Sequence, residues 1–383
     1  MTATKERNFG LDVMRFTAIV LVLIHHWVAF NLSNYAPVSA YAQYFSLFGY
    51  YGVEIFFVLS GFLIGNIIIK SFINAQYDFK SIKTFWMRRW LRTLPMYYFA
   101  LTINIIYALV RNNSLAFLWK YFLFLQNIFN YITINKDFFG ESWSLTIEEW
   151  FYLSFPLLLI IINILFKKFL SKKRILLLAI ILYVFIPTLT RFLLVYMQDP
   201  SWNNVLRKAV ICREDSIAYG LLGAFINNCY QIKISNYKKT AMMIIGSGLL
   251  VVCGVIFCKD VASDYMHRTG NVSLFSKTIL FSLVSFSVLL TIPFFFGFKT
   301  RYSFIRNPIT FVSKISYSIY LNHLFIEHFT HKIFHSNNLL NLFLRLFLFV
   351  SLTLIVSTLT FNFIENKFLL IRDKIWKEKY KAT

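Results

Sequence analysis

Long apolar stretches recur along the whole sequence, and they restrict the chain to an α-helical membrane protein. A helix that crosses a bilayer needs about 20 largely apolar residues. Of the 383 residues, 58% are apolar and 15% are charged, and the mean hydropathy of +0.60 leaves too little polar surface for a soluble chain of this length. Segments of the required length occur at 11–32, 47–69, 93–110, 146–166, 174–196, 213–228, 240–258, 275–298, 315–334 and 341–363.

One further segment, 115–134, is amphipathic and is predicted to lie at the interface or to enter the bilayer only part way. It contains a lysine and three side-chain amides: Lys120, Gln126, Asn127 and Asn130. If it does not cross, all dense basic runs fall on the cytoplasmic side, as basic residues of membrane proteins do. We therefore predict ten transmembrane helices with both termini in the cytoplasm. The loop 259–274 then faces outward.

The net charge of +22 comes from 39 basic and 17 acidic residues. Because the basic residues stand in short runs between apolar stretches, the pattern argues against a nucleic-acid partner. We predict one membrane domain over 1–383, with a core at about 9–366, a basic cytoplasmic tail at 367–383, no cleaved signal peptide and no soluble domain. The cysteines have neither disulfide nor metal spacing, and we expect them to be packing residues: Cys212, Cys229, Cys253 and Cys258.

The first segment carries two ionisable residues on one face. Arg15 and His26 are eleven residues apart, which on a helix returns to within about 20° of the same face and separates them by about 16 Å. Charged groups inside a bilayer are costly and usually face a polar cavity. The alternative is that Arg15 reaches lipid phosphate and His26 only hydrogen-bonds another helix. His25 is turned about 100° from this face, toward a neighbouring helix or lipid.

Two further patterns suggest an ion partner and a phosphate site. Glu54, near the outer end of the second segment, could pair with an arginine or a histidine, whereas Ser60 beside a glycine is typical of close helix packing. Arg89 and Arg92 lie one turn apart before Pro95. Guanidinium groups at that spacing suit the phosphates of a cofactor. Binding of lipid headgroups is the alternative for the two arginines.

The fourth segment opens with an acidic motif at the depth predicted for His26. Glu148 could orient and charge that imidazole and so make it a better base. Capping of the helix by Ser144 and an acid in its first turn is the competing interpretation. Arg213 and Asp215 could simply neutralise each other at a helix end.

The ninth segment brings Tyr320 and a third buried histidine, His323. Three more histidines follow near one helix face, namely His328, His331 and His335. They lack acidic or cysteine companions, so we expect no metal site.

Taken together, these residues resemble the membrane-bound acyltransferase 3 family, the O-acyltransferases of bacterial surface polysaccharides. The resemblance covers nearly the whole chain, and the order and spacing of its motifs are specific. They are Leu11–Asp12, Arg15, His26, Phe56–Phe62, Arg89, Arg92, Pro95, Trp143–Leu145, Glu148, Phe151, Tyr152, Arg213, Asp215, Ser316–Tyr317, Tyr320, Leu321 and His323.

The resemblance implies an enzyme of the cell inner membrane with a ten-helix core. Such enzymes take an acyl group, usually acetyl from acetyl-CoA, and deliver it to a hydroxyl of an extracytoplasmic glycan such as lipopolysaccharide O-antigen, capsule or exopolysaccharide. The essential arginine and histidine of the family carry over to Arg15 and His26, and its Arg-x-x-Arg pair to Arg89 and Arg92. Many relatives add a secreted hydrolase-like domain. We expect transfer here by the membrane core alone or with a separate partner.

The mechanism that we expect places the phosphates of acyl-CoA near Arg89 and Arg92, with Ser60 at the cofactor site, and the thioester beside His26. His26 is then either the base for the acceptor hydroxyl or the carrier of the acyl group, with Glu148 or Glu54 to orient it. A transporter or flippase of glycan precursors would also hold buried arginine, histidine and glutamate. The absence of an internal repeat disfavours it. The acceptor sugar, the acyl chain and the oligomeric state stay open.

Overall fold

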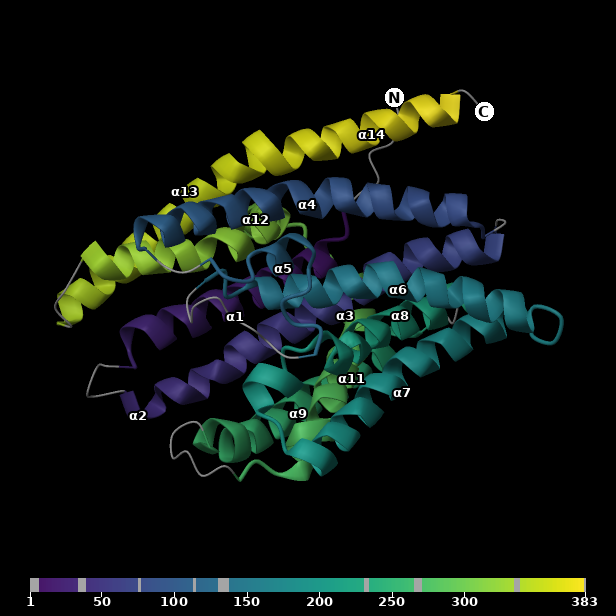
Figure 1. The fold of residues 1–383 in the computed structure, drawn as a ribbon, viewed down its shortest axis with the longest axis horizontal. Helices are drawn as coiled ribbons and strands as arrows, with labels where there is room; N and C mark the ends of the chain where they lie inside the picture. The colour runs from purple at the N-terminus through teal and green to yellow at the C-terminus, as the bar shows by residue number, and fades with distance from the viewer. Residues whose placement is uncertain are drawn as a thin grey trace.

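The computed structural model describes residues 7–33, 39–74, 77–112, 115–129, 138–230, 234–264, 271–333 and 338–381 (Figure 1). Each of the ten predicted segments corresponds to one helix. These helices are α1 (Phe9–Asn31), α3 (Ser46–Asn74), α4 (Phe79–Val110), α6 (Ser142–Phe166), α7 (Lys172–Gln198), α8 (Glu214–Cys229), α9 (Asn236–Phe257), α11 (Leu274–Gly297), α12 (Ser303–Ile333) and α13 (Leu339–Thr360).

The connections contain short helical pieces, and the last helix continues beyond its predicted end. The pieces are α2 (Ser39–Ala42), η1 (Gln43–Phe45), α5 (Trp119–Phe122), η2 (Trp202–Leu206), η3 (Val210–Cys212) and η4 (Cys258–Ala262). After α13 come a π-helical turn, η5 (Phe361–Glu365), and the helix α14 (Asn366–Lys381). The described residues contain no β-strand. The chain is thus an all-α polytopic membrane protein.

Eight helices of the described chain are long and apolar enough to cross a membrane. The other two predicted spans correspond to α8, which has only 16 residues, and α12, which carries many polar side chains. Helix α8 packs against α3, α7 and α11. A Cβ atom added to Gly61 of α3 would clash with the carbonyl oxygen of Ile217, and one added to Gly220 would clash with that of Val58. Glycine therefore lets α3 and α8 approach closely, as small residues do between membrane helices.

Two helices begin well before their predicted spans. Helix α4 starts at Phe79 and includes the basic run and Pro95, whereas the apolar segment starts at 93. Helix α12 starts at Ser303 rather than 315. The difference arises because arginine and lysine end an apolar window but are good helix formers. Arg89 and Arg92 therefore lie on a helix that continues through Pro95.

The amphipathic segment 115–134 forms no crossing helix over its described residues 115–129, where α5 is its only α-helix. Two of its side-chain amides form hydrogen bonds inside the protein. Gln126 donates a hydrogen bond to the Thr146 hydroxyl at 2.6 Å, and Asn127 donates to the Trp143 carbonyl at 2.9 Å. Asn130 lies outside the described residues.

Several of the basic segments lie toward one end of the molecule (Figure 1). Figure 1 shows the end of α3, the start of α4, the α6–α7 connection and α14 toward the right, and the ends of α1 and α12 at the left. The same view shows α13, η5 and α14 nearly in line along one edge beside α4. This common end of the basic segments supports the predicted sidedness, which stays a prediction.

The sidedness leads to a labelling prediction, because basic loops stay in the cytoplasm. In a variant without the four free cysteines, a cysteine introduced at Ser171 or Asn236 should resist an impermeant thiol reagent added to intact cells. A cysteine at Ser263 should react. Permeabilised cells, in which all three should react, provide the control. Labelling at Ser171 in intact cells would contradict the ten-helix topology.

Candidate functional site

A first cavity, which we call the basic cavity, is enclosed by α1, α3, α4, α6, α12 and the η5–α14 segment. Its volume is about 360 Å³, within the range of small-molecule sites. Six cations and two acids line it: Arg15, Arg88, Arg89, Arg92, Lys314, Arg372, Glu148 and Glu365. The cavity is therefore strongly cationic.

The basic cavity is long, and much of its wall is apolar. Along α3 its lining runs from Val53 to Ile67, which is fourteen helical steps, or about 21 Å. The α3 wall is mostly apolar and includes Phe56, Leu63 and Ile64. The shape suits a ligand with an anionic head and a long, weakly polar arm.

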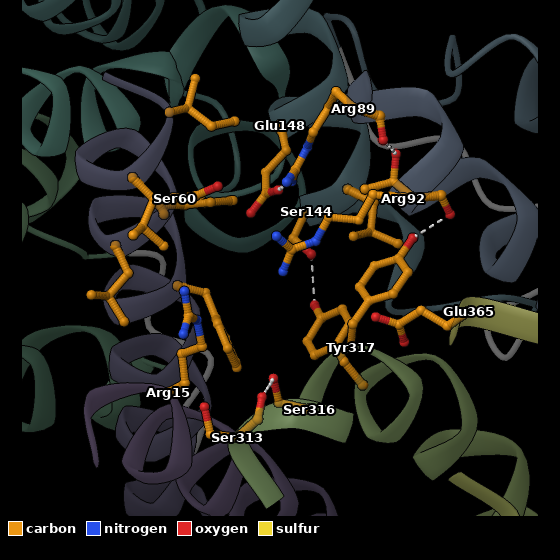
Figure 2. Close-up of a pocket in the computed structure, with 18 of the residues that line it drawn as sticks. Arg15, Ser60, Arg89, Arg92, Ser144, Glu148, Ser313, Ser316, Tyr317 and Glu365 are labelled. Atoms are coloured by element: carbon orange, nitrogen blue, oxygen red, sulfur yellow. Dashed lines mark hydrogen bonds and ion pairs between the residues drawn. The ribbon is translucent and has the colours of Figure 1, made fainter. Parts of the chain in front are cut away.

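Arg89 is held by two neighbours inside this cavity. Its Nη2 atom lies 2.9 Å from a carboxylate oxygen of Glu148 (Figure 2). The same atom lies 2.9 Å from the Tyr152 hydroxyl. The guanidinium also lies over the Tyr152 ring, 4.3 Å from its centroid. The Tyr152 hydroxyl is in turn hydrogen-bonded to Ser60. Ser60, Arg89 and Glu148 thus form one connected wall.

The expectation that Glu148 orients His26 is wrong, because Glu148 lines the basic cavity and pairs with Arg89, whereas His26 lines a different cavity. The shared depth of the two residues could be inferred from the sequence. The direction in which the Glu148 side chain points could not, because it depends on how α6 packs against α4.

Arg15 and Arg92 present their guanidinium groups to the basic cavity from opposite sides (Figure 2). Arg15 lies 3.2 Å from Asp12, which also binds Arg7 at 2.6 Å and accepts a hydrogen bond from Ser313 at 2.8 Å. Arg92 takes part in none of the ion pairs between described residues. It is therefore available to an anionic ligand.

A second cavity, which we call the histidine cavity, lies between α1, α3, α12, the start of α6 with the residues just before it, and the loop at 207–208. Its volume is about 200 Å³. Its polar lining comprises His25, His26, His328, Glu141, Arg207, Lys208 and Tyr320. The ring centroids of His25 and His26 are 4.6 Å apart, and those of His26 and His323 are 5.0 Å apart. His26 therefore stands between two other imidazoles.

His323 is oriented by a main-chain group. Its Nδ1 atom lies 2.7 Å from the carbonyl oxygen of Tyr320, so Nδ1 donates and Nε2 is left as an acceptor. The ring is fully buried and its Nε2 has no hydrogen-bond partner among the described residues. An imidazole oriented by this main-chain contact thus lies between His26 and Tyr320.

His25 is only partly as predicted. It faces the neighbouring helix α3, where a Cβ added to Gly49 would clash with its ring. However, its side chain also lines the histidine cavity beside His26. The 100° rotation between consecutive residues turns the two rings apart, but both still reach the same wide cavity.

Three lining residues of the histidine cavity were not predicted, and two of them have unusual pKa values. Burial raises the pKa of Glu141 to about 8, and burial beside Arg207 lowers the pKa of Lys208 to about 7. One signal could have revealed the pair at 207–208. These two adjacent cations lie between the fifth and sixth predicted spans, which ten crossings from a cytoplasmic N-terminus place outside, and basic residues there run against the usual charge bias of membrane proteins.

The two cavities meet at Tyr320. Val53 and Tyr320 line both of them. The Tyr320 and Ser144 hydroxyls are hydrogen-bonded at 2.7 Å, and Ser144 lines the basic cavity (Figure 2). A ligand in the basic cavity and another in the histidine cavity would therefore approach each other across this pair of hydroxyls.

Glu54, Arg213 and Asp215 lie outside both cavities and form buried ion pairs between helices. Glu54 pairs with Arg213 and accepts a hydrogen bond from Ser285 at 2.9 Å. Asp215 pairs with Arg191 at 2.8 Å. The expectations that Arg213 and Asp215 neutralise each other, and that Glu54 orients a histidine, are therefore wrong. These carboxylates find their cations on other helices.

The described residues include no group of three or more histidine, cysteine or acidic side chains that could hold a metal ion. His328 lines the histidine cavity and packs against Phe30 at a centroid distance of 4.8 Å, and His335 lies outside the described residues. The four cysteines are free and mostly buried.

Comparison with known proteins adds independent information on the family. Residues 8–362 match the family model described as an acyltransferase domain. The chain is 26% identical over 331 residues to O-acetyltransferase OatA of Staphylococcus aureus, covering 82% of this chain and 49% of that protein. It is 27% identical over 409 residues to peptidoglycan O-acetyltransferase OatA of Listeria monocytogenes, covering 97% and 59%. The chain thus spans about half the length of these relatives. No solved structure matches it.

Proposed function

Because the chain belongs to the acyltransferase 3 family, we propose that it is an inner-membrane O-acyltransferase that uses acyl-CoA as donor. The transferred group is acetyl, and the acceptor is a hydroxyl of an extracytoplasmic glycan. The observation that carries the donor assignment is the basic cavity, with its cationic lining and its long apolar wall.

The chemistry of acyl-CoA fits this cavity. Its nucleotide part carries several phosphate charges, which arginine side chains bind through charge-assisted hydrogen bonds. The pantetheine arm is long and uncharged, and a cavity that runs about 21 Å along α3 can take such an arm. With the phosphates at Arg92, the thioester end is directed toward Ser144 and Tyr320. Arg89 acts here mainly by holding Glu148 and Tyr152 in the wall.

The acceptor hydroxyl enters the histidine cavity and meets the thioester at Tyr320. His26 either removes the hydroxyl proton or first takes the acyl group on its ring nitrogen. In the first route, the alcohol oxygen attacks the thioester carbonyl, the carbon–sulfur bond breaks, and the thiolate regains a proton from the imidazolium. The hydroxyls of Ser144 and Tyr320 are suited to stabilise the negative oxygen of the intermediate.

The acceptor is proposed as a glycan of the cell envelope because both relatives are named O-acetyltransferases and one is named for peptidoglycan. Mass analysis of envelope glycans from cells with and without the protein identifies the acceptor. Loss of ester-linked acyl groups is the expected result. A change in the amount of surface glycan without loss of ester would favour the transporter alternative.

The donor site yields a kinetic prediction. Arg92→Ala should raise the Michaelis constant for acetyl-CoA roughly ten- to hundredfold, because charge-assisted hydrogen bonds contribute roughly 1.5–3 kcal/mol each. Membranes supplied with labelled acetyl-CoA provide the assay. Lys83→Ala is the matched control, since Lys83 is an exposed cation of the same helix outside the cavity lining. An unchanged Michaelis constant in Arg92→Ala would assign this arginine to lipid headgroups instead.

A further inference from the structure

The C-terminal helix α14 borders the basic cavity, although it lies beyond residues 8–362, which match the family model. It packs against α4, and the preceding turn η5 packs against α4 and α12 (Figure 1). The start of α14 is anchored by Glu365, a buried residue that accepts a hydrogen bond from Ser318 at 2.9 Å. The helix is therefore docked on the wall of the cavity.

One face of this C-terminal segment is directed at the cavity. Arg372 follows Glu365 by seven residues, and both line the cavity. Seven residues return to within about 20° of the same helix face, about 10 Å further along. In Figure 2 the carboxylate of Glu365 points toward the interior. Arg372 thus lies on the same face, further toward the C-terminal end of α14.

Arg372 keeps enough freedom to bind a ligand. Its ion pair is with its sequence neighbour Asp373 at 2.7 Å, and the two side chains are 22% and 49% exposed. An exposed pair of this kind contributes little free energy. Lys314 lines the same cavity from α12, and Arg92 lines it from α4. Three helices therefore supply cations around the space that we assign to the donor.

We propose that α14 completes the donor site and that Arg372 binds a phosphate of the nucleotide part of acyl-CoA. This inference rests on the proposed function. The shared chemistry is phosphate binding, and a lipid headgroup is the other source of phosphate. Leu370 and Ile371 are 62% and 46% exposed, which is typical of a helix at a membrane surface. The test must therefore separate the nucleotide from the lipid.

The experiment is calorimetric titration of CoA into the purified protein in nanodiscs of zwitterionic lipid. Arg372→Ala should weaken CoA binding about tenfold, as expected for one lost charge-assisted contact, and Arg372→Lys should recover part of the loss. The dependence of the affinity on salt should also become shallower, because one phosphate contact is gone. Lys374→Ala, which removes an exposed cation of the same helix that does not line the cavity, should bind CoA as the unaltered protein does.

Three outcomes would contradict the inference. Equal CoA affinity of Arg372→Ala and the unaltered protein in zwitterionic nanodiscs would assign Arg372 to lipid headgroups. A weaker affinity with an unchanged salt dependence would mean that Arg372 only supports the packing of α14. If the unaltered protein does not bind CoA, the donor assignment fails together with the inference. Absence of CoA binding by the unaltered protein is distinct from the result in which CoA binds equally well to the unaltered protein and to Arg372→Ala.

Discussion

Replacement of His26 by alanine should abolish acyl transfer while the protein still accumulates in the membrane. If His26 is the base or the acyl carrier, turnover should fall at least about 100-fold. Folding should be spared, because His26 borders a cavity and its nearest aromatic neighbours are two other imidazoles. Labelled ester formed per molecule of detergent-solubilised protein measures turnover, and size-exclusion profiles report the folded fraction.

His25→Ala is the matched control for His26→Ala. The two residues are adjacent and line the same cavity. Replacement by alanine removes the same imidazole group from each. His25 packs against Gly49 of α3, whereas His26 is the ring in contact with His323, so replacement of His25 should reduce turnover much less. Near-normal acylation by well-folded His26→Ala protein would remove His26 from the catalytic role. A trapped acyl group on His26 would select the carrier route over the base route.

Arg213→Ala should destabilise the protein by about 3–5 kcal/mol, because it leaves the carboxylate of Glu54 buried without its cation. Both side chains are almost completely buried, and neither is among the lining residues of the basic cavity or the histidine cavity. We therefore expect low yield and a lower midpoint of thermal unfolding in detergent, with the remaining folded protein keeping its affinity for CoA.

The double variant Glu54→Leu/Arg213→Met distinguishes a structural role from a catalytic one. Removing both charges and filling the space with apolar side chains of similar volume should restore much of the lost stability. Restored stability with restored transfer is the expected result. Folded double-variant protein that binds CoA but transfers nothing would place this ion pair in the reaction after all.

Much of the helical architecture could be predicted from the sequence, because the length and apolarity of a membrane helix are local properties. The ten segments correspond to ten helices for this reason. The start of α4 at Phe79 was missed because a basic run ends an apolar window without ending a helix. The short α8 and the polar α12 rely on their neighbours for burial, which the sequence pattern does not reveal.

The pairing of charged side chains was predicted less well, since it depends on the packing of helices far apart in sequence. Glu148 pairs with Arg89 on α4, and Glu54 pairs with Arg213 at the start of α8. Neither partner could be identified from spacing along one helix. Arg372 was missed because nothing in the sequence distinguishes it from the other basic residues of the C-terminal tail. Only the docking of α14 against α4 gives it a place beside the cavity.

Transmembrane acyl transfer is tested most simply with the purified protein in liposomes. Acetyl-CoA labelled in the acetyl group is supplied on the side of α14, and envelope glycan is enclosed on the other side. We expect labelled ester on the enclosed glycan, formed by the unaltered protein and lost in His26→Ala. Glycan or CoA that crosses the bilayer without any ester formed would contradict this expectation and would identify a transporter.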